Sequence, residues 1–273
     1  MKIKDLLDNK TIDKNENYLA ISSLLSMSIP EIKLNKEKEI SKKELKNYLK
    51  IKKQLEKGET IQYILKKANF YGNDFYINKN VLVPRPETET LVEITNNLIK
   101  ETIKNKEINI LDIGTGSGVI AITLNLLNKN SKITATDISK KALKVAKINN
   151  KKNKTNVKFI KTNLYEKNNQ KYDVIISNPP YIDKNDNKIE EKVKNNEPSL
   201  ALFAKDEGLF YYKEILKNIN KIINEKHIIA FEIGEGQGNK IKEIIEKYLP
   251  NDNVTIKKDY NGFERYIFIT SKK

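Results

Sequence analysis

Apolar side chains at the start of the chain recur at helical intervals. They stand three or four positions apart in groups such as Tyr18-Leu19, Ile21 and Leu24-Leu25, and again near Ile61 and Ile64-Leu65. No strand-like alternation of apolar and polar positions interrupts them. Residues 1–69 are therefore predicted to form a small helical domain.

The spacing changes at residue 70. Apolar runs over residues 70–77 and 81–83 stand on either side of Asn78-Lys79-Asn80, a polar stretch that is typical of a turn. This pattern predicts a β-hairpin, and residues 70–86 are interpreted as a hairpin linker between two domains.

From residue 87 onward, helical and strand-like segments alternate. Such alternation predicts an α/β fold with a mostly parallel sheet and helices on both faces over residues 87–273. The last two strands are close enough in sequence to pair antiparallel. A helix is expected near residues 87–104, and strands near 108–113, 132–137, 157–162, 173–177, 227–233, 253–259 and 265–270.

Composition excludes several kinds of chemistry. The chain has 273 residues, enough for one large domain and a small one, and it contains no cysteine and a single histidine. Disulfides, thiolate nucleophiles and histidine-based metal clusters or triads are therefore excluded, and no metal site is expected. His227 begins an apolar run and is interpreted as a strand-edge residue.

The net charge of +15 agrees with nucleic-acid binding, because basic surfaces attract polyanions. The excess is, however, spread through sequence rich in Lys, Asn and Ile, and runs such as Lys151-Lys152-Asn153-Lys154 are typical of solvated helix ends. No apolar stretch approaches the roughly 18 residues of a membrane span, and no signal-peptide core follows Met1. A soluble cytoplasmic protein that does not associate with membranes is expected.

A glycine-rich loop follows the first strand of the α/β part. Gly114-Thr115-Gly116-Ser117-Gly118 comes after the apolar run at 110–113 and before the helical run at 119–124. Glycines at a strand-to-helix turn let the backbone approach a ligand closely, although such a turn also occurs in α/β domains without a ligand. The Gly-x-Gly-x-Gly spacing favours S-adenosylmethionine over a nicotinamide cofactor.

The next strand ends in Asp137, 23 residues after Gly114. A carboxylate at this distance is typical of a ribose-binding residue in a nucleotide-binding half. The alternative is a helix N-cap, a role for which Ser139 is equally suited. Asp137, Asn163 and Asn178 all fall at the carboxyl ends of predicted strands, where an open α/β sheet binds ligands.

Asn178-Pro179-Pro180-Tyr181 directly follows the apolar run at 173–177. The nitrogen of an amide or of a nucleobase amine is a poor nucleophile, and an Asn side-chain oxygen together with a backbone carbonyl offers two acceptors for its N–H bonds. The pattern therefore indicates methylation of a planar NH2 group, with Tyr181 against that plane. A rigid turn at the end of a strand is the structural alternative.

Several motifs occur in the order found in one protein family. They are Val81-Leu82-Val83-Pro84-Arg85-Pro86-Glu87-Thr88-Glu89, the glycine loop, Ser177-Asn178-Pro179-Pro180-Tyr181-Ile182, Glu197-Pro198-Ser199-Leu200-Ala201-Leu202 and Glu232-Ile233-Gly234. With these motifs the chain resembles, over essentially its whole length, release factor glutamine methyltransferases of the PrmC/HemK type. The resemblance implies a class I, Rossmann-like methyltransferase with a seven-stranded, mostly parallel sheet and a small N-terminal substrate-docking domain.

The resemblance also implies a reaction and partners. Family members transfer a methyl group from S-adenosylmethionine, leaving S-adenosylhomocysteine, to the glutamine side-chain amide in the Gly-Gly-Gln loop of class I peptide chain release factors. This modification supports translation termination. Nucleic acid is not required in this reaction, and the resemblance assigns no oligomeric state.

Site residues follow from the resemblance position by position. The cofactor-binding set is Gly114, Thr115, Gly116, Ser117, Gly118, Asp137, Asn163, Leu164 and Asn178. The family tends to have an acid and a larger aromatic residue where Asn163 and Leu164 stand. The catalytic set is Asn178, Pro179 and Tyr181, and the substrate-binding set is Asn178, Pro179, Pro180, Tyr181 and Glu197.

Two motif segments have an alternative interpretation. Residues 84–89 either close over the pocket or start a helix, since Pro is favoured at the first helical position and acids in the first turn. Glu197 either lines the substrate entrance or is a loop acid before Pro198. Ala204-Lys205-Asp206-Glu207-Gly208 departs from the glycine-richer turn that is usual in the family.

Two other functions are weighed against this one. An exocyclic-amine methyltransferase acting on DNA or RNA fits the Asn-Pro-Pro-Tyr tetrad and the charge, but it predicts a base-binding module that the sequence does not indicate. A non-catalytic binding platform with the same fold has no need for an amide clamp beside a cofactor site.

Overall fold

The computed structural model describes residues 1–103, 107–166, 170–186 and 189–272. Two compact units make up the chain. The helical unit contains Met1–Lys67 and Glu190–Asn196, and the sheet unit contains Ala68–Ile189 and Glu197–Lys273. Each unit is described by itself.

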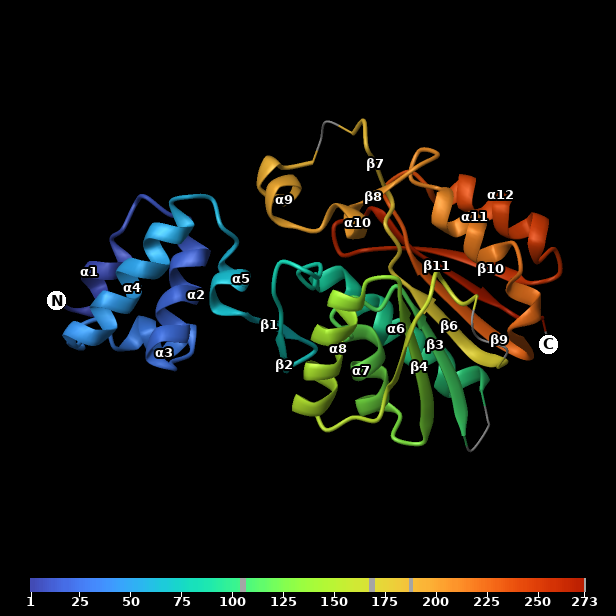
Figure 1. Cartoon of the computed structure of the whole chain (residues 1–273), viewed down its shortest axis with the longest axis horizontal. Helices are drawn as coiled ribbons and strands as arrows, with labels where there is room; N and C mark the ends of the chain where they lie inside the picture. Colours follow the sequence, from blue (N-terminus) through green and yellow to red (C-terminus); the bar gives the residue numbers. More distant parts are fainter. Residues whose placement is uncertain (104–106, 167–169, 187–188, 273) are drawn as a thin grey trace. The chain divides into compact units, whose positions relative to one another are not determined.

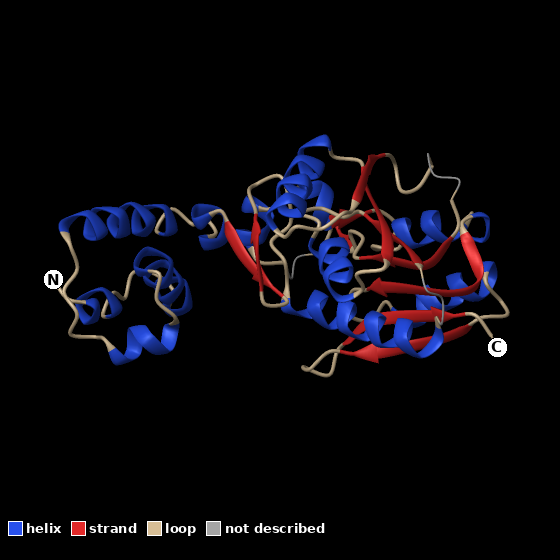
Figure 2. Cartoon of the chain, turned by 90° about the horizontal axis from the view of Figure 1, so that it is seen from below, coloured by secondary structure: helices blue, strands red, loops and turns tan. Residues whose placement is uncertain are grey.

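The first part of the helical unit folds into short helices around a small apolar core, and Figure 2 draws it in helices and loops. Ser28 with Glu31, and Ser41 with Glu44, form capping boxes that satisfy the first N–H groups of two of these helices. Tyr48 is buried in the core, and its hydroxyl donates to Asn17 Oδ1 at 2.9 Å. The helices are α1 (Ile3–Leu7), α2 (Lys14–Leu25), α3 (Ile29–Leu34), α4 (Lys42–Leu55) and α5 (Ile61–Leu65).

A segment far along the chain completes the helical unit. Glu190–Asn196 contains helix α9 (Glu191–Asn196) and groups with the first 67 residues. Lys192 Nζ lies 2.7 Å from Glu16 Oε1, and Asn196 Nδ2 donates to the Gly58 carbonyl at 3.0 Å. The helical unit is therefore built from two separate stretches of sequence.

Seven strands form the main sheet in the described part of the sheet unit, in the order β10-β11-β9-β6-β3-β4-β5 (Figure 1). Neighbours from β9 to β5 run parallel, and β11 lies antiparallel between β9 and β10. The predicted α/β fold with an antiparallel final pair is confirmed. The strands are β3 (Ile108–Ile113), β4 (Ser131–Asp137), β5 (Lys158–Lys161), β6 (Tyr172–Ser177), β9 (Ile223–Glu232), β10 (Asn253–Lys258) and β11 (Glu264–Thr270).

Helices cover both faces of this sheet, and successive strand residues point to opposite faces (Figure 1). Val174 and Ile176 pack in one apolar cluster with α6 and α7, whereas Ile175 packs in the other with α11 and α12. Buried on both faces, β6 is apolar throughout except at its ends. The remaining elements are α6 (Pro86–Thr102), α7 (Val119–Leu127), α8 (Lys140–Lys152), α10 (Ser199–Leu202), α11 (Phe210–Leu216), η1 (Ile219–Lys221), α12 (Gly238–Tyr248), and the two-residue strands β7 (Ile182–Asp183) and β8 (Phe203–Ala204).

The hairpin is real, but its predicted position was wrong. Its strands are β1 (Lys67–Phe70) and β2 (Asn73–Tyr76), and its turn lies at Tyr71-Gly72. Both turn residues have positive φ, 49° and 73°, as a two-residue hairpin turn requires. The apolar run at residues 81–83 is not a strand: it is buried at Val81 and Val83 and lies in a loop that leads into α6.

No helix among residues 1–103, 107–166, 170–186 and 189–272 is long and apolar enough to cross a lipid bilayer.

Candidate active site

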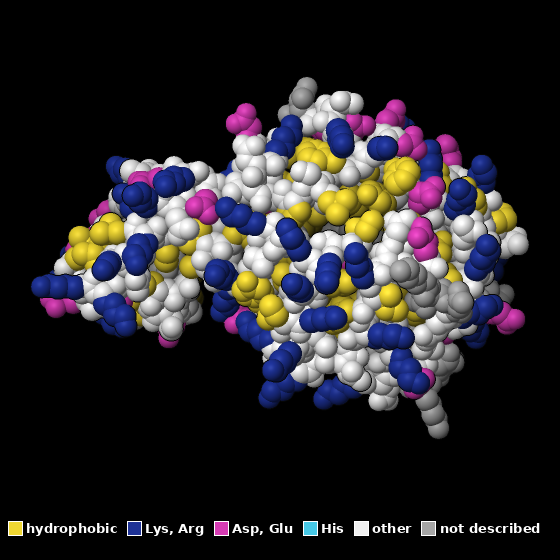
Figure 3. Space-filling view, in the orientation of Figure 1, with side chains coloured by type: hydrophobic (Ala, Val, Ile, Leu, Met, Phe, Trp, Pro, Cys, Tyr) yellow, Lys and Arg dark blue, Asp and Glu magenta, His cyan; other side chains and the backbone are white. Residues whose placement is uncertain are grey.

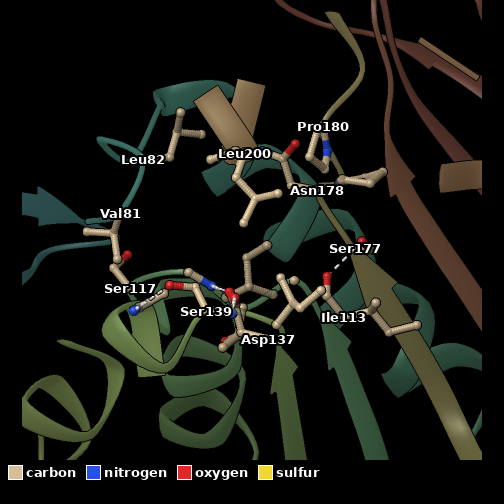
Figure 4. A pocket seen from close by; sticks show the side chains of 18 of the residues that line it. Val81, Leu82, Ile113, Ser117, Asp137, Ser139, Ser177, Asn178, Pro180 and Leu200 are labelled. Atoms are coloured by element: carbon tan, nitrogen blue, oxygen red, sulfur yellow. Dashed lines mark hydrogen bonds between the residues drawn. The ribbon is translucent and has the colours of Figure 1, made fainter. Parts of the chain in front are cut away.

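A cavity lies at the carboxyl ends of β3 and β6, two adjacent parallel strands at the centre of the sheet (Figure 4). From β3 the chain continues to β4 and β5 on one side, and then returns to β6 and β9 on the other. Loops that leave β3 and β6 therefore diverge, and this divergence opens a crevice where open α/β sheets bind ligands. Ile113 and Ser177, the last residues of the two strands, are paired in register and both line the cavity.

The glycine loop forms one wall of the cavity. Gly114 and Gly116 have φ of +74° and +55°, and nothing lies within 4 Å of the position that a Cβ would take on either residue. Both residues line the cavity, as do Thr115 and Ser117. The backbone is thus open to a ligand at these positions.

Gly118 has a different role from the other predicted loop residues. It is not among the residues that line the cavity; it is the N-cap of α7, with φ of +85°. A Cβ there would stand 3.2 Å from the Cβ of Ala146. Gly118 therefore lets α7 pack closely against α8.

Asp137 lies at the carboxyl end of β4 and also lines the cavity. Its carboxylate accepts the Gly116 N–H at 2.9 Å and the Ser139 N–H at 2.7 Å, so it holds the glycine loop in place. Burial raises the pKa of Asp137, and the two N–H donors oppose this effect. Ser139, whose Oγ accepts from Ala142 N–H, is the N-cap of α8.

Asn163 and Leu164, predicted near the adenine, both line the cavity. Asn163 is exposed, and its Nδ2 donates to Glu166 Oε1 at 2.6 Å. Leu164 has φ of 47° and packs on the apolar cluster beneath α11.

Beneath the glycine loop, Asp112 is fully buried. Thr115 Oγ1 donates to its Oδ2 at 2.6 Å. Burial raises the pKa of Asp112 to about 7, although the hydrogen bond from Thr115 acts in the opposite direction. The loop therefore rests on a carboxyl group that changes its charge near neutral pH.

Asn178, Pro179 and Pro180 line the cavity at the end of β6. Figure 4 shows Asn178 and Pro180 on the opposite side of the cavity from Asp137 and Ser139. Asn178 Nδ2 donates to Thr88 Oγ1 at 3.2 Å. The tetrad is thus tied to α6, a helix 90 residues earlier in the sequence.

The hydroxyl of Thr88 donates in turn to Glu232 Oε2 at 2.7 Å. Glu232 is the last residue of β9, the strand beside β6, and is buried. Tyr181 does not line the cavity; its hydroxyl donates to Glu232 Oε1 at 3.2 Å. Burial and the Glu232 carboxylate raise the pKa of Tyr181, so the phenol is neutral and acts as a donor.

Glu197 also lies behind the cavity wall and not on its surface. Its side chain is 3% exposed and accepts from the Arg85 guanidinium and, at 3.2 Å, from the Val83 N–H. Val81, Leu82, Pro84 and Arg85, in the loop that precedes α6, line the cavity. Glu197 therefore fastens that loop.

Residues 84–89 satisfy both interpretations of their motif. Pro86 is the first residue of α6, and Glu87 and Glu89 lie in its first turn, so the predicted helix start is confirmed. Pro84, Arg85 and Thr88 line the cavity as well.

The sequence analysis did not assign roles to several residues of this site. Thr88 and Glu232 were seen only as parts of longer motifs, and Val81 and Leu82 were assigned to a strand. Glu232 ends a predicted strand next to an Ile-Gly pair, so the rule that ligands gather at carboxyl ends of strands could have indicated it. Thr88, inside a helix, carries no such signal.

Hydrophobic side chains gather around α10 in the space-filling view, with Lys and Arg side chains around them (Figure 3). Leu200 of α10 is 54% exposed and lines the cavity together with Ala201. Pro180 and Leu82 extend this apolar lining. The mouth of the cavity is therefore suited to uncharged groups.

Comparison with known proteins places this cavity in a methyltransferase. Residues 89–197 match the methyltransferase small domain family. The sheet unit resembles a solved methyltransferase from Pyrococcus furiosus, with 20% identity, a TM-score of 0.56, and coverage of 78% of this chain and 94% of that one. The 16S rRNA N2 G1207 methyltransferase of Thermus thermophilus, solved with AdoMet and guanosine, has a TM-score of 0.54 at 11% identity and covers 76% of this chain and 50% of that one. These similarities establish the fold.

The sequence relatives are more specific. The release factor glutamine methyltransferase of Bacillus cereus is 35% identical over 260 residues, which cover 94% of this chain and 92% of the relative. The enzyme of the same name from Mycoplasma mycoides subsp. mycoides is 36% identical over 274 residues, covering 98% and 95%. That from Fusobacterium nucleatum is 40% identical and covers 90% and 70%. Both domains of the chain are included in these matches, and the chain belongs to the family of release factor glutamine methyltransferases.

Proposed function

We propose that this protein transfers a methyl group from S-adenosylmethionine to the side-chain amide nitrogen of the glutamine in the Gly-Gly-Gln motif of class I peptide chain release factors. The observation that carries the proposal is the position of Asn178 and Pro179 at the cavity, across from the glycine loop and Asp137. The names of the full-length relatives support a protein substrate over the exocyclic amine of DNA or RNA. Release factors act in the cytoplasm, and we assign the enzyme to it.

The residues at the first end of the cavity fit the cofactor. Gly114 and Gly116 leave their backbone open to a ligand, and Asp137 offers a carboxylate to the ribose hydroxyls while holding the Gly116 N–H. Asn163 and Leu164 border the space for the adenine. S-adenosylmethionine, when bound, supplies a methyl group on a positively charged sulfur.

The residues at the second end hold the acceptor. A glutamine side-chain amide is planar, and its nitrogen lone pair is delocalised into the carbonyl, so orientation contributes most of the catalysis. Asn178 Oδ1 and the Pro179 carbonyl accept the two N–H groups and turn the nitrogen toward the methyl group. The nitrogen–carbon bond forms as the sulfur–carbon bond breaks, and one N–H proton leaves to solvent.

Tyr181 and Glu197 support this arrangement from behind the wall. Tyr181 is hydrogen-bonded to Glu232 next to the tetrad, and Glu197 fastens the loop that carries Leu82 and Pro84. We assign the helical unit to docking of the release factor, because a small, separate helical body suits recognition of a folded protein.

The test uses the full-length protein with isotopically labelled S-adenosylmethionine and one of three substrates: a class I release factor, duplex DNA or ribosomal RNA. Peptide mass spectrometry then locates the label. Label on the Gly-Gly-Gln glutamine, absent when that glutamine is replaced by alanine, supports the proposal. Label on nucleic acid alone, or on another residue of the release factor, contradicts it.

A further inference from the structure

Three side chains from distant parts of the sheet unit form a hydrogen-bonded chain behind the proposed acceptor site. Asn178 Nδ2 donates to Thr88 Oγ1 at 3.2 Å, and Thr88 Oγ1 donates to Glu232 Oε2 at 2.7 Å. Thr88 is 4% exposed and Glu232 is 2% exposed. Water is thus excluded from this chain, and the partners of each group are the protein groups themselves.

The direction of each hydrogen bond follows from the chemistry of the groups. A threonine hydroxyl has one hydrogen, and an ionised carboxylate only accepts. Thr88 therefore gives its hydrogen to Glu232, and its oxygen is left as an acceptor toward Asn178. Only the NH2 end of the Asn178 amide satisfies that acceptor.

This order leaves the carbonyl end of the Asn178 amide unused. Within the described part of the chain, Oδ1 of Asn178 makes no hydrogen bond, whereas Nδ2 is bonded to Thr88. The two ends of a carboxamide have nearly the same shape, and hydrogen bonds decide which end occupies which position. Asn178 borders the cavity, so the acceptor is the end that remains for a ligand there.

We propose that Thr88 and Glu232 are positioning residues that hold the Asn178 amide with its oxygen, and not its NH2 group, toward the methyl acceptor. This inference rests on the proposed function, in which Asn178 Oδ1 accepts an N–H of the glutamine amide. The opposite orientation would set two N–H donors against each other. Thr88 and Glu232 act through Asn178, because neither reaches the reacting nitrogen in this scheme.

The charge of Glu232 sets the direction of the whole chain. Thr88 donates to one of its oxygens and Tyr181 to the other, which is the pattern of an ionised carboxylate. Burial raises the pKa of Glu232 and nearby Glu87 adds to this, whereas the two donors and the positive charge of Arg265 lower it. A protonated Glu232 would donate to Thr88 and free the threonine hydrogen for Asn178 Oδ1, which would reverse the amide.

The first test is Thr88→Val, which keeps the side-chain shape and removes the hydroxyl. We expect kcat on the release factor to fall about 10-fold or more, a magnitude typical of the loss of an outer hydrogen-bond partner, while cofactor Kd stays within about twofold. Thr88→Ser restores the hydroxyl and should recover most of that loss. The matched control is Thr95→Val in the same helix, because Thr95 is also buried but donates to the Leu91 carbonyl, away from the cavity.

A double-mutant cycle separates positioning from a purely structural role. If Thr88 acts through Asn178, Thr88→Val should slow an Asn178→Ala enzyme by less than about twofold. A structural role would reduce turnover by the same factor in both backgrounds, and that result would overturn the proposal.

The pH profile tests Glu232. In the parent, kcat at saturating substrates should fall at acid pH as Glu232 is protonated. Glu232→Gln offers Thr88 either a donor or an acceptor, so kcat should be lower at neutral pH and this acid limb should disappear. An unchanged acid limb in Glu232→Gln contradicts the assignment, and this measurement carries the test if Thr88→Val does not fold.

The outcomes also separate this inference from the proposed function. If Asn178→Ala leaves turnover unchanged, the amide clamp itself is wrong, and the positioning inference fails with it. If Asn178→Ala slows turnover but Thr88→Val and Glu232→Gln do not, the clamp stands and the positioning inference alone is overturned.

Discussion

The two ends of the cavity are built in different ways. At the cofactor end, Asp112, Gly116 and Asp137 come from two neighbouring strand-and-loop segments within 26 residues of sequence, and their contacts are largely to backbone N–H groups. At the transfer end, Thr88, Asn178 and Glu232 are joined by side-chain hydrogen bonds that span 90 and 144 residues. The cofactor end is thus a local motif, whereas the transfer end exists only once the sheet has formed.

The buried carboxyl groups of the two ends differ accordingly. Asp112 accepts a side-chain hydrogen bond from Thr115, three residues away, and burial raises its pKa to about 7. Glu232 accepts from Thr88 and Tyr181, which belong to two other elements. We therefore expect changes at the cofactor end to alter stability and affinity, and changes at the transfer end to alter turnover.

The largest effect is expected at the transfer end. Asn178→Ala removes the acceptor that holds the glutamine amide and should lower kcat on the order of 100-fold or more, as for loss of one preorganised polar contact. Cofactor Kd, measured by calorimetry, should stay within about threefold. Asn185→Ala, at an exposed position on the following loop, is the control and should leave kcat unchanged. A large loss of cofactor affinity in Asn178→Ala would remove the distinction between the two ends.

A pH-dependent effect on stability is expected beneath the glycine loop. The pKa of Asp112 is about 7 in the folded protein and ordinary, near 3.8, in the unfolded chain. Between these values the folded state holds an extra proton, so Asp112 makes the free energy of unfolding fall as pH rises. From about pH 5 to about pH 7.5 this contribution is on the order of 2 kcal/mol, since one pKa unit is about 1.4 kcal/mol.

Asp112→Asn removes that titration. Thermal unfolding across this pH range should show the Tm of the variant rising relative to the parent by about 5 °C as pH increases. Parallel Tm curves for the two proteins would mean that Asp112 does not change its charge in this range.

Asp137→Ala should weaken cofactor binding about 10-fold, because one buried hydrogen-bond acceptor for the ribose and for the Gly116 N–H is lost. The kcat at saturating cofactor should change less than about threefold. Asp137→Asn keeps one acceptor oxygen and should lie between the two. A loss confined to kcat would place Asp137 in the transfer step and contradict the ribose assignment.

The smallest effect concerns the wall. Glu197→Gln keeps an acceptor but removes the charge that pairs with Arg85, whose side chain is 35% exposed, so the loss should be about 1 kcal/mol. We expect Tm to fall by about 3 °C and cofactor affinity to fall about threefold. The control is Glu207→Gln, which breaks an exposed pair with Lys240 and should change neither quantity. Equal effects of the two variants would show that Glu197 does not hold the cavity wall.

Much of the sheet follows from the sequence alone. Strands β3, β4 and β6 end within one residue of their predicted positions, because strands buried on both faces appear as short apolar runs. The glycine loop and Asp137 were found for the same reason, since each directly follows such a run. Family resemblance, carried by several motifs in order, then identified the reaction.

The hairpin shows where a local pattern is insufficient. Asn78-Lys79-Asn80 has the composition of a turn, but the turn forms at Tyr71-Gly72, where Phe70 and Phe75 enter the core of the sheet unit. The polar stretch instead opens the loop that leads to the cavity. Side chains that pack in the core decide between two possible turns, and an apolar run does not reveal its packing partners.

The sequence by itself determined the alternating architecture, the glycine loop, the carboxylate that follows it and the Asn-Pro-Pro-Tyr tetrad. Each of these depends on neighbouring residues and on the period of apolar positions. Only the tertiary structure decided that Thr88 and Glu232 meet Asn178, that Glu197 fastens the wall, and that residues 190–196 join the helical unit. Those contacts join residues far apart in the chain, and their geometry exists only after the strands have been placed side by side.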